Sequence, residues 1–408
     1  MALENKVLSS ILVKPAGPDC NLACEYCFYL KKADLFAQSR SHRMSDPVLR
    51  EMVSQVMKQG GKQISFGWQG GEPTLMGLGF FKRAVEYQAR FGSAGQVVGN
   101  GLQTNGVLID GEWASFLRQA GFLVGLSLDG PAEIHNRYRR FPSGKPSWDR
   151  VVRARDLLLS AGVEVNALVV VNDYSVRFPS DIYNDHKRHG LSYVQFIPCV
   201  ELDPRTPGRA APFSVSAEAF GRFLCEVFDL WRADFVDGRP GTSVRWFDSL
   251  FYTYVGRPAP ECTLLQECGI YVVVEHNGDV YACDFFVDPE WRLGNIKDSR
   301  IVDMLNSKRQ GEFGAIKRNR PPECAECPWL RHCWGGCPKD RAGDPRDRGS
   351  NHFCLSYKMF FEHADAEFRR MAQEWKNRQR SGNGSQPVRD EDPCPCGSGR
   401  CYADCCKG

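Results

Sequence analysis

Three cysteines lie close together near the start of the chain, in the segment CNLACEYCFY. Cys20, Cys24 and Cys27 follow the spacing C-x3-C-x2-C. Three such thiolates can hold three irons of a cubane cluster and leave the fourth iron without a protein ligand, whereas cysteine-ligated clusters normally take four. An open coordination position is where chemistry can occur. The spacing alone would also suit a zinc site with a distant fourth ligand, or reduced structural thiols.

A second set of eight cysteines is spaced C-x5-C-x14-C, then C-x2-C-x5-C-x3-C, then one more. Eight thiolates are enough for two fully ligated four-iron clusters, and a pair of structural zinc sites is the alternative. A fully ligated cluster has no open iron for a substrate, so it is better suited to carrying electrons. The set consists of Cys262, Cys268, Cys283, Cys324, Cys327, Cys333, Cys337 and Cys354.

The end of the chain has a third pattern, C-x-C-x8-C-C. Four thiolates in so short a segment fit tetrahedral zinc, whose binding would itself drive the folding of a segment too short to form a core. A fourth iron–sulfur site is the alternative. The predicted zinc ligands are Cys394, Cys396, Cys405 and Cys406.

The first half of the chain alternates strand-like and helix-like segments. Six βα units in a row predict an α/β fold with a parallel sheet, either doubly wound or curled into a partial (β/α)6 barrel of the TIM type. In such folds the site lies at the carboxyl ends of the strands, where the cysteine triplet and residues 70–73 (GGEP) are expected. The predicted strands are 8–14, 62–68, 96–103, 122–128, 163–171 and 191–198, and the predicted helices are 46–59, 80–91, 111–120, 147–161 and 179–189.

Composition excludes several classes of protein. The chain has 408 residues and 18 cysteines, a share well below the roughly 8–10% of a disulfide scaffold. With 52 basic and 49 acidic residues, its net charge of +3 gives no support to a nucleic-acid or membrane-surface role. No signal peptide or membrane-spanning stretch is recognisable, so we expect a cytoplasmic protein with metal or redox chemistry. The predicted domains are residues 1–235, 236–375, a linker at 376–391 and a tail at 392–408.

The triplet, with Tyr26 before its last cysteine, and the later GGEP segment together resemble the radical S-adenosylmethionine enzymes. The resemblance implies a 4Fe-4S cluster on Cys20, Cys24 and Cys27 that binds S-adenosylmethionine. It also implies cofactor contacts, although several of these residues could instead be capping, surface or core groups. The implied contacts are Gly70, Gly71 and Glu72 for the amino group, Ser127 and Arg150 for the carboxylate, Gln69 lining the site and Tyr29 near the adenine.

The later cysteines resemble the SPASM domain of radical enzymes that modify peptides and proteins. That likeness implies two auxiliary 4Fe-4S clusters, and so three clusters in all. One would be held by Cys262, Cys268, Cys283 and Cys337, and the other by Cys324, Cys327, Cys333 and Cys354.

A closer match, in the segment GDVYACDFF at 278–286, is to the anaerobic sulfatase-maturating enzymes. These convert a cysteine or serine of a sulfatase to formylglycine. The likeness implies that a 5′-deoxyadenosyl radical abstracts a hydrogen atom from the target residue and that Asp284 is the general base. It also implies a sulfatase polypeptide with a motif of the type Cys/Ser-x-Pro/Ala-x-Arg as substrate, and flavodoxin or ferredoxin as reductant.

Two other functions fit less well. Another SPASM enzyme could crosslink or epimerise a peptide, but only 19 residues precede Cys20, too few for an N-terminal leader-binding domain. A non-catalytic iron–sulfur carrier would give no reason for an open cluster beside GGEP. The tail itself resembles the zinc-binding SEC-C motif, which implies docking to a chaperone, ribosome or translocation component.

Overall fold

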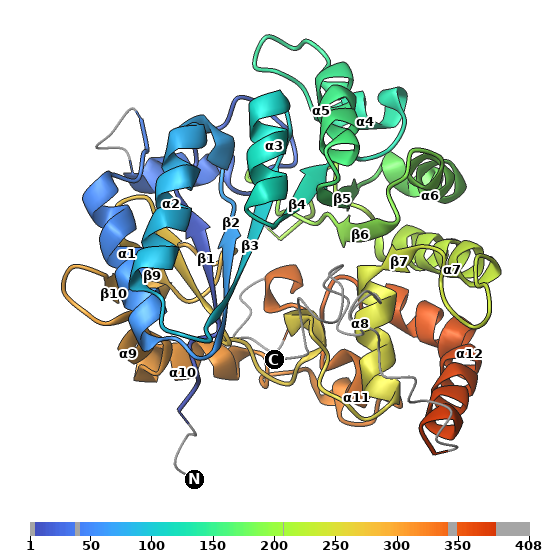
Figure 1. Ribbon diagram of the computed structural model, residues 1–408. Helices are drawn as coiled ribbons and strands as arrows, with labels where there is room; N and C mark the ends of the chain where they lie inside the picture. Colours follow the sequence, from blue (N-terminus) through green and yellow to red (C-terminus); the bar gives the residue numbers. More distant parts are fainter. Residues whose placement is uncertain (1–4, 37–40, 207, 342–348, 381–408) are drawn as a thin grey trace. The chain divides into compact units, whose positions relative to one another are not determined.

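The computed structural model (Figure 1) describes residues 5–36, 41–206, 208–341 and 349–380. The predicted zinc ligands Cys394, Cys396, Cys405 and Cys406 lie outside the described residues. The rest forms two compact units, each built from separate pieces of chain. Unit 1 takes its residues from 1–128, 135–165 and 268–316, and unit 2 from 129–134, 166–267 and 317 onward. These units divide the chain differently from the predicted domain boundaries at 235 and 375, which remain predictions.

Unit 1 contains the first four predicted strands, β1 (Ser10–Lys14), β2 (Gln63–Trp68), β3 (Val97–Thr104) and β4 (Phe122–Ser127). Each pairs in parallel with the next, as predicted. A strand far along the chain, β8 (Val272–Glu275), pairs in parallel with the other side of β1. The antiparallel strands β9 (Asp279–Tyr281) and β10 (Arg292–Asn295) extend that edge. Residues from the second cysteine set are thereby brought to the first strand.

The helices of unit 1 are those that follow its successive parallel strands β1 to β4 and two that follow β10. They are α1 (Asp46–Gln59), α2 (Leu78–Phe91), α3 (Gly111–Gln119) and α5 (Trp148–Ser160), with α9 (Ile301–Leu305) and α10 (Lys308–Ile316) from the later segment (Figure 1). In β2, Ile64, Phe66 and Trp68 are buried in alternation, and Trp68 packs edge-on against Phe80 and Phe81 of α2. Trp68, from the alternating apolar side chains of β2, thus packs on the apolar face of α2. Each element therefore shows its own periodicity in the sequence, from which it could be predicted.

Unit 2 contains most of β5 (Glu164–Val171), which pairs in parallel with β6 (Tyr193–Pro198), and β6 with the short β7 (Ser243–Val244). Its helices include α6 (Pro179–Arg188), α7 (Ala217–Ala233), α8 (Arg245–Tyr254) and α11 (Leu330–Cys333). The long α12 (Cys354–Arg380) packs along α7 (Figure 1). A further helix, α4 (Ala132–Tyr138), crosses the boundary between the units. Among the described residues, no helix has both the length and the apolar character needed to cross a membrane.

Candidate functional site

The three N-terminal cysteines lie on the loop that follows β1, and all three are partly buried. Two nitrogen donors face the sulfur of Cys20. They are the backbone N–H of Leu22 at 3.4 Å and the side-chain amide of Asn105 at 3.7 Å. Burial raises the pKa of the Cys20 thiol to about 12, and the nearby Glu72 adds to the shift. A cationic group is therefore needed to hold this sulfur as a thiolate. Three cysteines on one loop, with two donors aimed at the sulfur of Cys20, fit the predicted iron–sulfur group.

The GGEP turn follows β2 and rests directly on the cysteine loop. The N–H of Gly71 donates to the carbonyl of Gly17 (2.8 Å), and that of Glu72 donates to the carbonyl of Asp19 (2.7 Å). A side chain at Gly71 is impossible here, since its Cβ would lie 2.0 Å from the Asp19 oxygen. Gly70 has a φ of +134°, which only glycine adopts readily. The two motifs are thus one local structure.

Glu72 is buried, and its carboxylate is fully engaged by the protein. One oxygen accepts from the N–H and hydroxyl of Thr74 (3.0 and 2.6 Å) and from the hydroxyl of Thr104 (2.8 Å). The other accepts from the N–H of Asn105 (2.8 Å). Burial raises the pKa of Glu72, and these hydrogen bonds oppose the shift. Glu72 therefore joins the loops after β2 and β3, in addition to any contact with a cofactor.

Replacing Glu72 with glutamine should destabilise the protein by about 2 kcal/mol. The amide NH2 that replaces one carboxylate oxygen would face the donors that now bond to that oxygen, and these buried donors would lose their acceptor. We expect a lower Tm in thermal unfolding of the purified protein. The exposed Glu86 of α2 provides the control, since Glu86→Gln should change stability by less than about 0.5 kcal/mol. Equal Tm values for the two variants would contradict this role.

The two residues predicted to contact the cofactor carboxylate differ in their exposure to solvent. Ser127 is the last residue of β4 and is 9% exposed, whereas Arg150 is exposed in the first turn of α5. Among the described residues no hydrogen bond joins them. Their assignments remain predictions.

Tyr29 is buried in a core cluster with Val273, Tyr281 and Val287. Its hydroxyl donates to the carboxylate of Glu275, and the ammonium of Lys14 lies 3.4 Å from the centre of its ring. This position favours the core role that the sequence left open for Tyr29.

Lys14 and Glu275 were not identified from the sequence. Lys14 is the last residue of β1 and is 1% exposed, and Glu275 pairs with it across to β8 and is also buried. Burial lowers the pKa of Lys14, while Asp284 and Glu275 oppose the shift. The only signal in the sequence is a charged residue at the end of each apolar strand, which does not show that two such strands are neighbours.

The structure brings Asp284 to the GGEP turn, more than two hundred residues earlier in the chain. The amide of Gln69 donates to Asp284 Oδ2 (3.2 Å), and the hydroxyl of Tyr271 donates to Oδ1 (2.9 Å). Phe285, the next residue, packs on Phe28 beside Cys27 with 4.8 Å between ring centres. Gln69 and Asp284, both predicted from the sequence, are therefore in contact near the cysteine loop. Tyr271 was not predicted.

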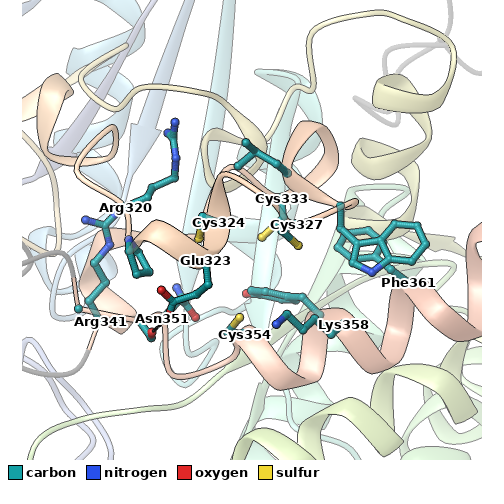
Figure 2. A pocket seen from close by; sticks show the side chains of 17 residues that line it. Arg320, Glu323, Cys324, Cys327, Cys333, Arg341, Asn351, Cys354, Lys358 and Phe361 are labelled. Atoms are coloured by element: carbon teal, nitrogen blue, oxygen red, sulfur yellow. Dashed lines mark hydrogen bonds between the residues drawn. The ribbon is translucent and has the colours of Figure 1, made fainter.

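Four cysteines predicted as one ligand set line a single pocket of unit 2 (Figure 2). Burial raises the pKa of the Cys333 thiol to about 11 and also raises the pKa values of Cys324 and Cys354. The pocket therefore favours neutral thiols until a cationic group binds. The set is Cys324, Cys327, Cys333 and Cys354.

The other predicted set is divided between the units. Cys268 and Cys283 pack against the same apolar cluster of unit 1, around Phe313 and Ile316. Cys262 and Cys337 belong to unit 2, where the Cys262 carbonyl accepts from Lys317 (2.9 Å) and the Cys337 carbonyl accepts from Asn351 (3.0 Å). None of the thirteen cysteines in the described part of the chain is in a disulfide.

Comparison with known proteins gives the family. The Radical SAM superfamily profile matches residues 15–177, and the SPASM profile, an iron–sulfur cluster-binding domain, matches residues 266–328. The serine-type anaerobic sulfatase-maturating enzyme of Bacteroides thetaiotaomicron is 40% identical over 397 residues, covering 93% of this chain and 95% of that protein. The cysteine-type enzyme of Clostridium perfringens strain 13 is 40% identical over 357 residues, covering 87% and 96%.

A solved structure described as native anSMEcpe with bound AdoMet and Cp18Cys peptide has a TM-score of 0.83 and 38% identity, covering 90% of this chain and 99% of that one. Streptococcus suis SuiB bound to S-adenosylmethionine, at 15% identity and a TM-score of 0.58, shares the fold over 84% of this chain and 76% of its own. These findings confirm the predicted fold class of a parallel-sheet α/β domain followed by a SPASM domain. The chain belongs to the anaerobic sulfatase-maturating enzymes of the radical S-adenosylmethionine superfamily.

Proposed function

We propose that this chain oxidises a cysteine or serine of a sulfatase polypeptide to Cα-formylglycine. The observation that carries the proposal is the hydrogen bond from Gln69 to Asp284. It joins Gln69, directly before the turn expected to hold S-adenosylmethionine, to Asp284, the residue that follows Cys283 in the sequence. The chain belongs to a family in which both motifs occur together. A serine-type and a cysteine-type relative are each 40% identical to this chain, over 397 and 357 residues, so either target residue fits.

In this proposal Cys20, Cys24 and Cys27 hold a 4Fe-4S cluster, and the GGEP turn and Ser127 contact S-adenosylmethionine. When bound, the cluster and S-adenosylmethionine supply the radical that abstracts hydrogen from the target residue. Asp284 accepts the proton from the thiol or hydroxyl of that residue, and the remaining electron would leave through the auxiliary clusters. Serine then gives the aldehyde directly, and the thioaldehyde formed from cysteine is hydrolysed to formylglycine. Gln69 holds Oδ2 of Asp284 at 3.2 Å, so the acceptor is oriented before the target arrives.

The remaining cluster cysteines are proposed as ligands of two auxiliary 4Fe-4S clusters. Cys324, Cys327, Cys333 and Cys354 meet in one pocket, which supports their assignment to one group. Cys262, Cys268, Cys283 and Cys337 are assigned to the other by resemblance. A flavodoxin or ferredoxin is proposed as reductant. A reducing cytoplasm is the proposed compartment, because cysteines outside disulfides, as the thirteen described ones are, persist there.

The test is anaerobic incubation of the reduced, iron-loaded enzyme with S-adenosylmethionine and two peptides, Cys-x-Pro-x-Arg and its serine counterpart. We expect mass spectrometry to find an aldehyde in at least one peptide, with 5′-deoxyadenosine as co-product. A thioether crosslink or an epimerised residue in place of the aldehyde would contradict the proposal and favour another peptide-modifying activity. No cleavage of S-adenosylmethionine would favour a non-catalytic iron–sulfur carrier.

For the metal content we expect about twelve irons and one zinc per chain, from three four-iron clusters and one tetrahedral tail site. Anaerobic metal analysis measures both. Truncation after Arg380 leaves α12 intact and removes the proposed zinc ligands Cys394, Cys396, Cys405 and Cys406, so it should remove the zinc and leave the iron unchanged. Iron lost on truncation would mean that the tail holds an iron–sulfur group. The proposed docking of the tail to a chaperone, ribosome or translocation component predicts that truncation lowers maturation in cells and spares activity on short peptides.

A further inference from the structure

Tyr271 lies where two parts of the proposed chemistry meet. Its hydroxyl is 2.9 Å from Oδ1 of Asp284 and 3.5 Å from the sulfur of Cys283. These two atoms belong to the proposed proton acceptor and to a proposed ligand of an auxiliary cluster, and the Cys283 sulfur itself lies 3.4 Å from Oδ1 of Asp284. All three residues lie in unit 1, and Tyr271 precedes β8, whose pairing with β1 brings this segment to the first strand. The inference rests on the proposed roles of Asp284 and Cys283.

Each oxygen of Asp284 has its own side-chain donor. Gln69 donates to Oδ2 and Tyr271 donates to Oδ1, so the carboxylate cannot rotate without losing both hydrogen bonds. The Tyr271 ring is itself held, because its backbone carbonyl accepts from the buried Gln310 (2.9 Å) and its side chain packs against the core cluster of Tyr29, Val273, Tyr281 and Val287. Tyr271 is therefore a fixed support for Asp284.

A phenol has one hydrogen to donate, and here two acceptors compete for it. The Tyr271 hydroxyl lies within reach of both atoms at once, so its hydrogen can be shared between Oδ1 of Asp284 and the sulfur of Cys283, which would accept as a thiolate when it ligates a cluster. A hydrogen bond to a ligand sulfur favours the reduced form of an iron–sulfur cluster.

We propose that Tyr271 is a positioning residue that couples the two: it orients Asp284 for the proton, and its hydroxyl makes the auxiliary group bound through Cys283 easier to reduce. Losing the hydroxyl should therefore have two separate effects. Fewer radical events should end in aldehyde, because Asp284 is less well held. The reduction potential of one auxiliary cluster should fall, because a donor to sulfur is lost.

The variant Tyr271→Phe tests this, because it removes only the hydroxyl and keeps the ring and the backbone bond to Gln310. Its matched control is Tyr281→Phe in the same unit. Tyr281 is a buried tyrosine two residues before Cys283, and among the described residues its hydroxyl bonds neither Asp284 nor Cys283. Both variants are compared with the parent enzyme for the ratio of 5′-deoxyadenosine to aldehyde. We expect a several-fold rise for Tyr271→Phe and no change for Tyr281→Phe.

The second measurement does not depend on turnover. In a background where Cys20, Cys24 and Cys27 are alanine, an anaerobic redox titration followed by electron paramagnetic resonance reports only the auxiliary clusters. Tyr271→Phe should lower one potential, and replacing Tyr271 with 3-fluorotyrosine, a more acidic phenol and stronger donor, should raise it. Potentials of both Tyr271 variants equal to those of Tyr281→Phe would overturn the proposal.

If Tyr271→Phe binds less iron than the parent enzyme, the fluorotyrosine variant still tests the proposal, because it keeps the ring and the hydroxyl. Its reduction potential should rise. If the proposed function fails, no aldehyde forms with the parent enzyme. If only this inference fails, the parent enzyme makes aldehyde and the potentials do not move.

Discussion

Replacing Asp284 with asparagine should abolish aldehyde formation while cleavage of S-adenosylmethionine continues. An asparagine keeps the shape of the side chain and can still accept the Tyr271 hydrogen bond, but its amide cannot take up a proton. The cysteine loop, the GGEP turn and Ser127 are untouched. Removing a positioned general base typically costs a factor of about 10² to 10⁴, so the aldehyde should fall below detection in ordinary assays.

The measurement is a paired quantification of 5′-deoxyadenosine and formylglycine from one reaction. Asp288 supplies the control, since it lies four residues further on and pairs with Lys32 at 2.8 Å with its side chain 42% exposed. Asp288→Asn should leave both products close to the parent level. Normal aldehyde from Asp284→Asn would remove Asp284 from the mechanism, and loss of both products would show that it serves the binding of the cofactor instead.

Replacing Cys20, Cys24 and Cys27 together with alanine should end S-adenosylmethionine cleavage entirely. No other group of thiols in the described residues lies beside the GGEP turn, where Gly71 and Glu72 bond to the same loop. The iron content should fall from about twelve to about eight per chain, because the two proposed auxiliary clusters would keep their four ligands each. Anaerobic iron analysis and detection of 5′-deoxyadenosine measure the two effects in the same preparation.

A thiol outside the ligand sets provides the control. Cys225 on α7 is half-buried and faces the carbonyl of Met359 (3.8 Å), and Cys225→Ala should change neither iron content nor cleavage. Retention of about twelve irons by the triple variant would show that the triplet holds no cluster. Loss of all iron would show that the auxiliary sites depend on the triplet for folding.

Much of the fold could be predicted from local pattern. Ile64, Phe66 and Trp68 alternate in β2, while Pro47 lies in the first turn of α1 and Gly60 follows its last residue, so periodicity and turn residues identify both elements. The N-cap of this helix is Ser45. Parallel strands joined by helices also require the loops after β1 and β2 to meet at one edge. The structure shows them meeting, through Gly71 and Glu72.

The grouping of Cys20, Cys24 and Cys27 on one loop could also be predicted, because residues so close in sequence must lie close in space. The pairing of β8 with β1 could not be predicted, since a strand of three valines and one glutamate carries no signal of which edge of the sheet it joins. That pairing buries Lys14 beside Tyr29 and Glu275.

The sequence by itself therefore determined the α/β class, the three cysteine patterns and the resemblance that names Asp284. Only the tertiary structure decided that Gln69 and Tyr271 hold Asp284 from two sides, that Tyr271 also reaches the Cys283 sulfur, and that Glu72 joins two loops. The reason is physical. Spacing within one loop or strand follows from covalent geometry, whereas contacts between residues hundreds of positions apart depend on which strand edges pair and which faces are buried.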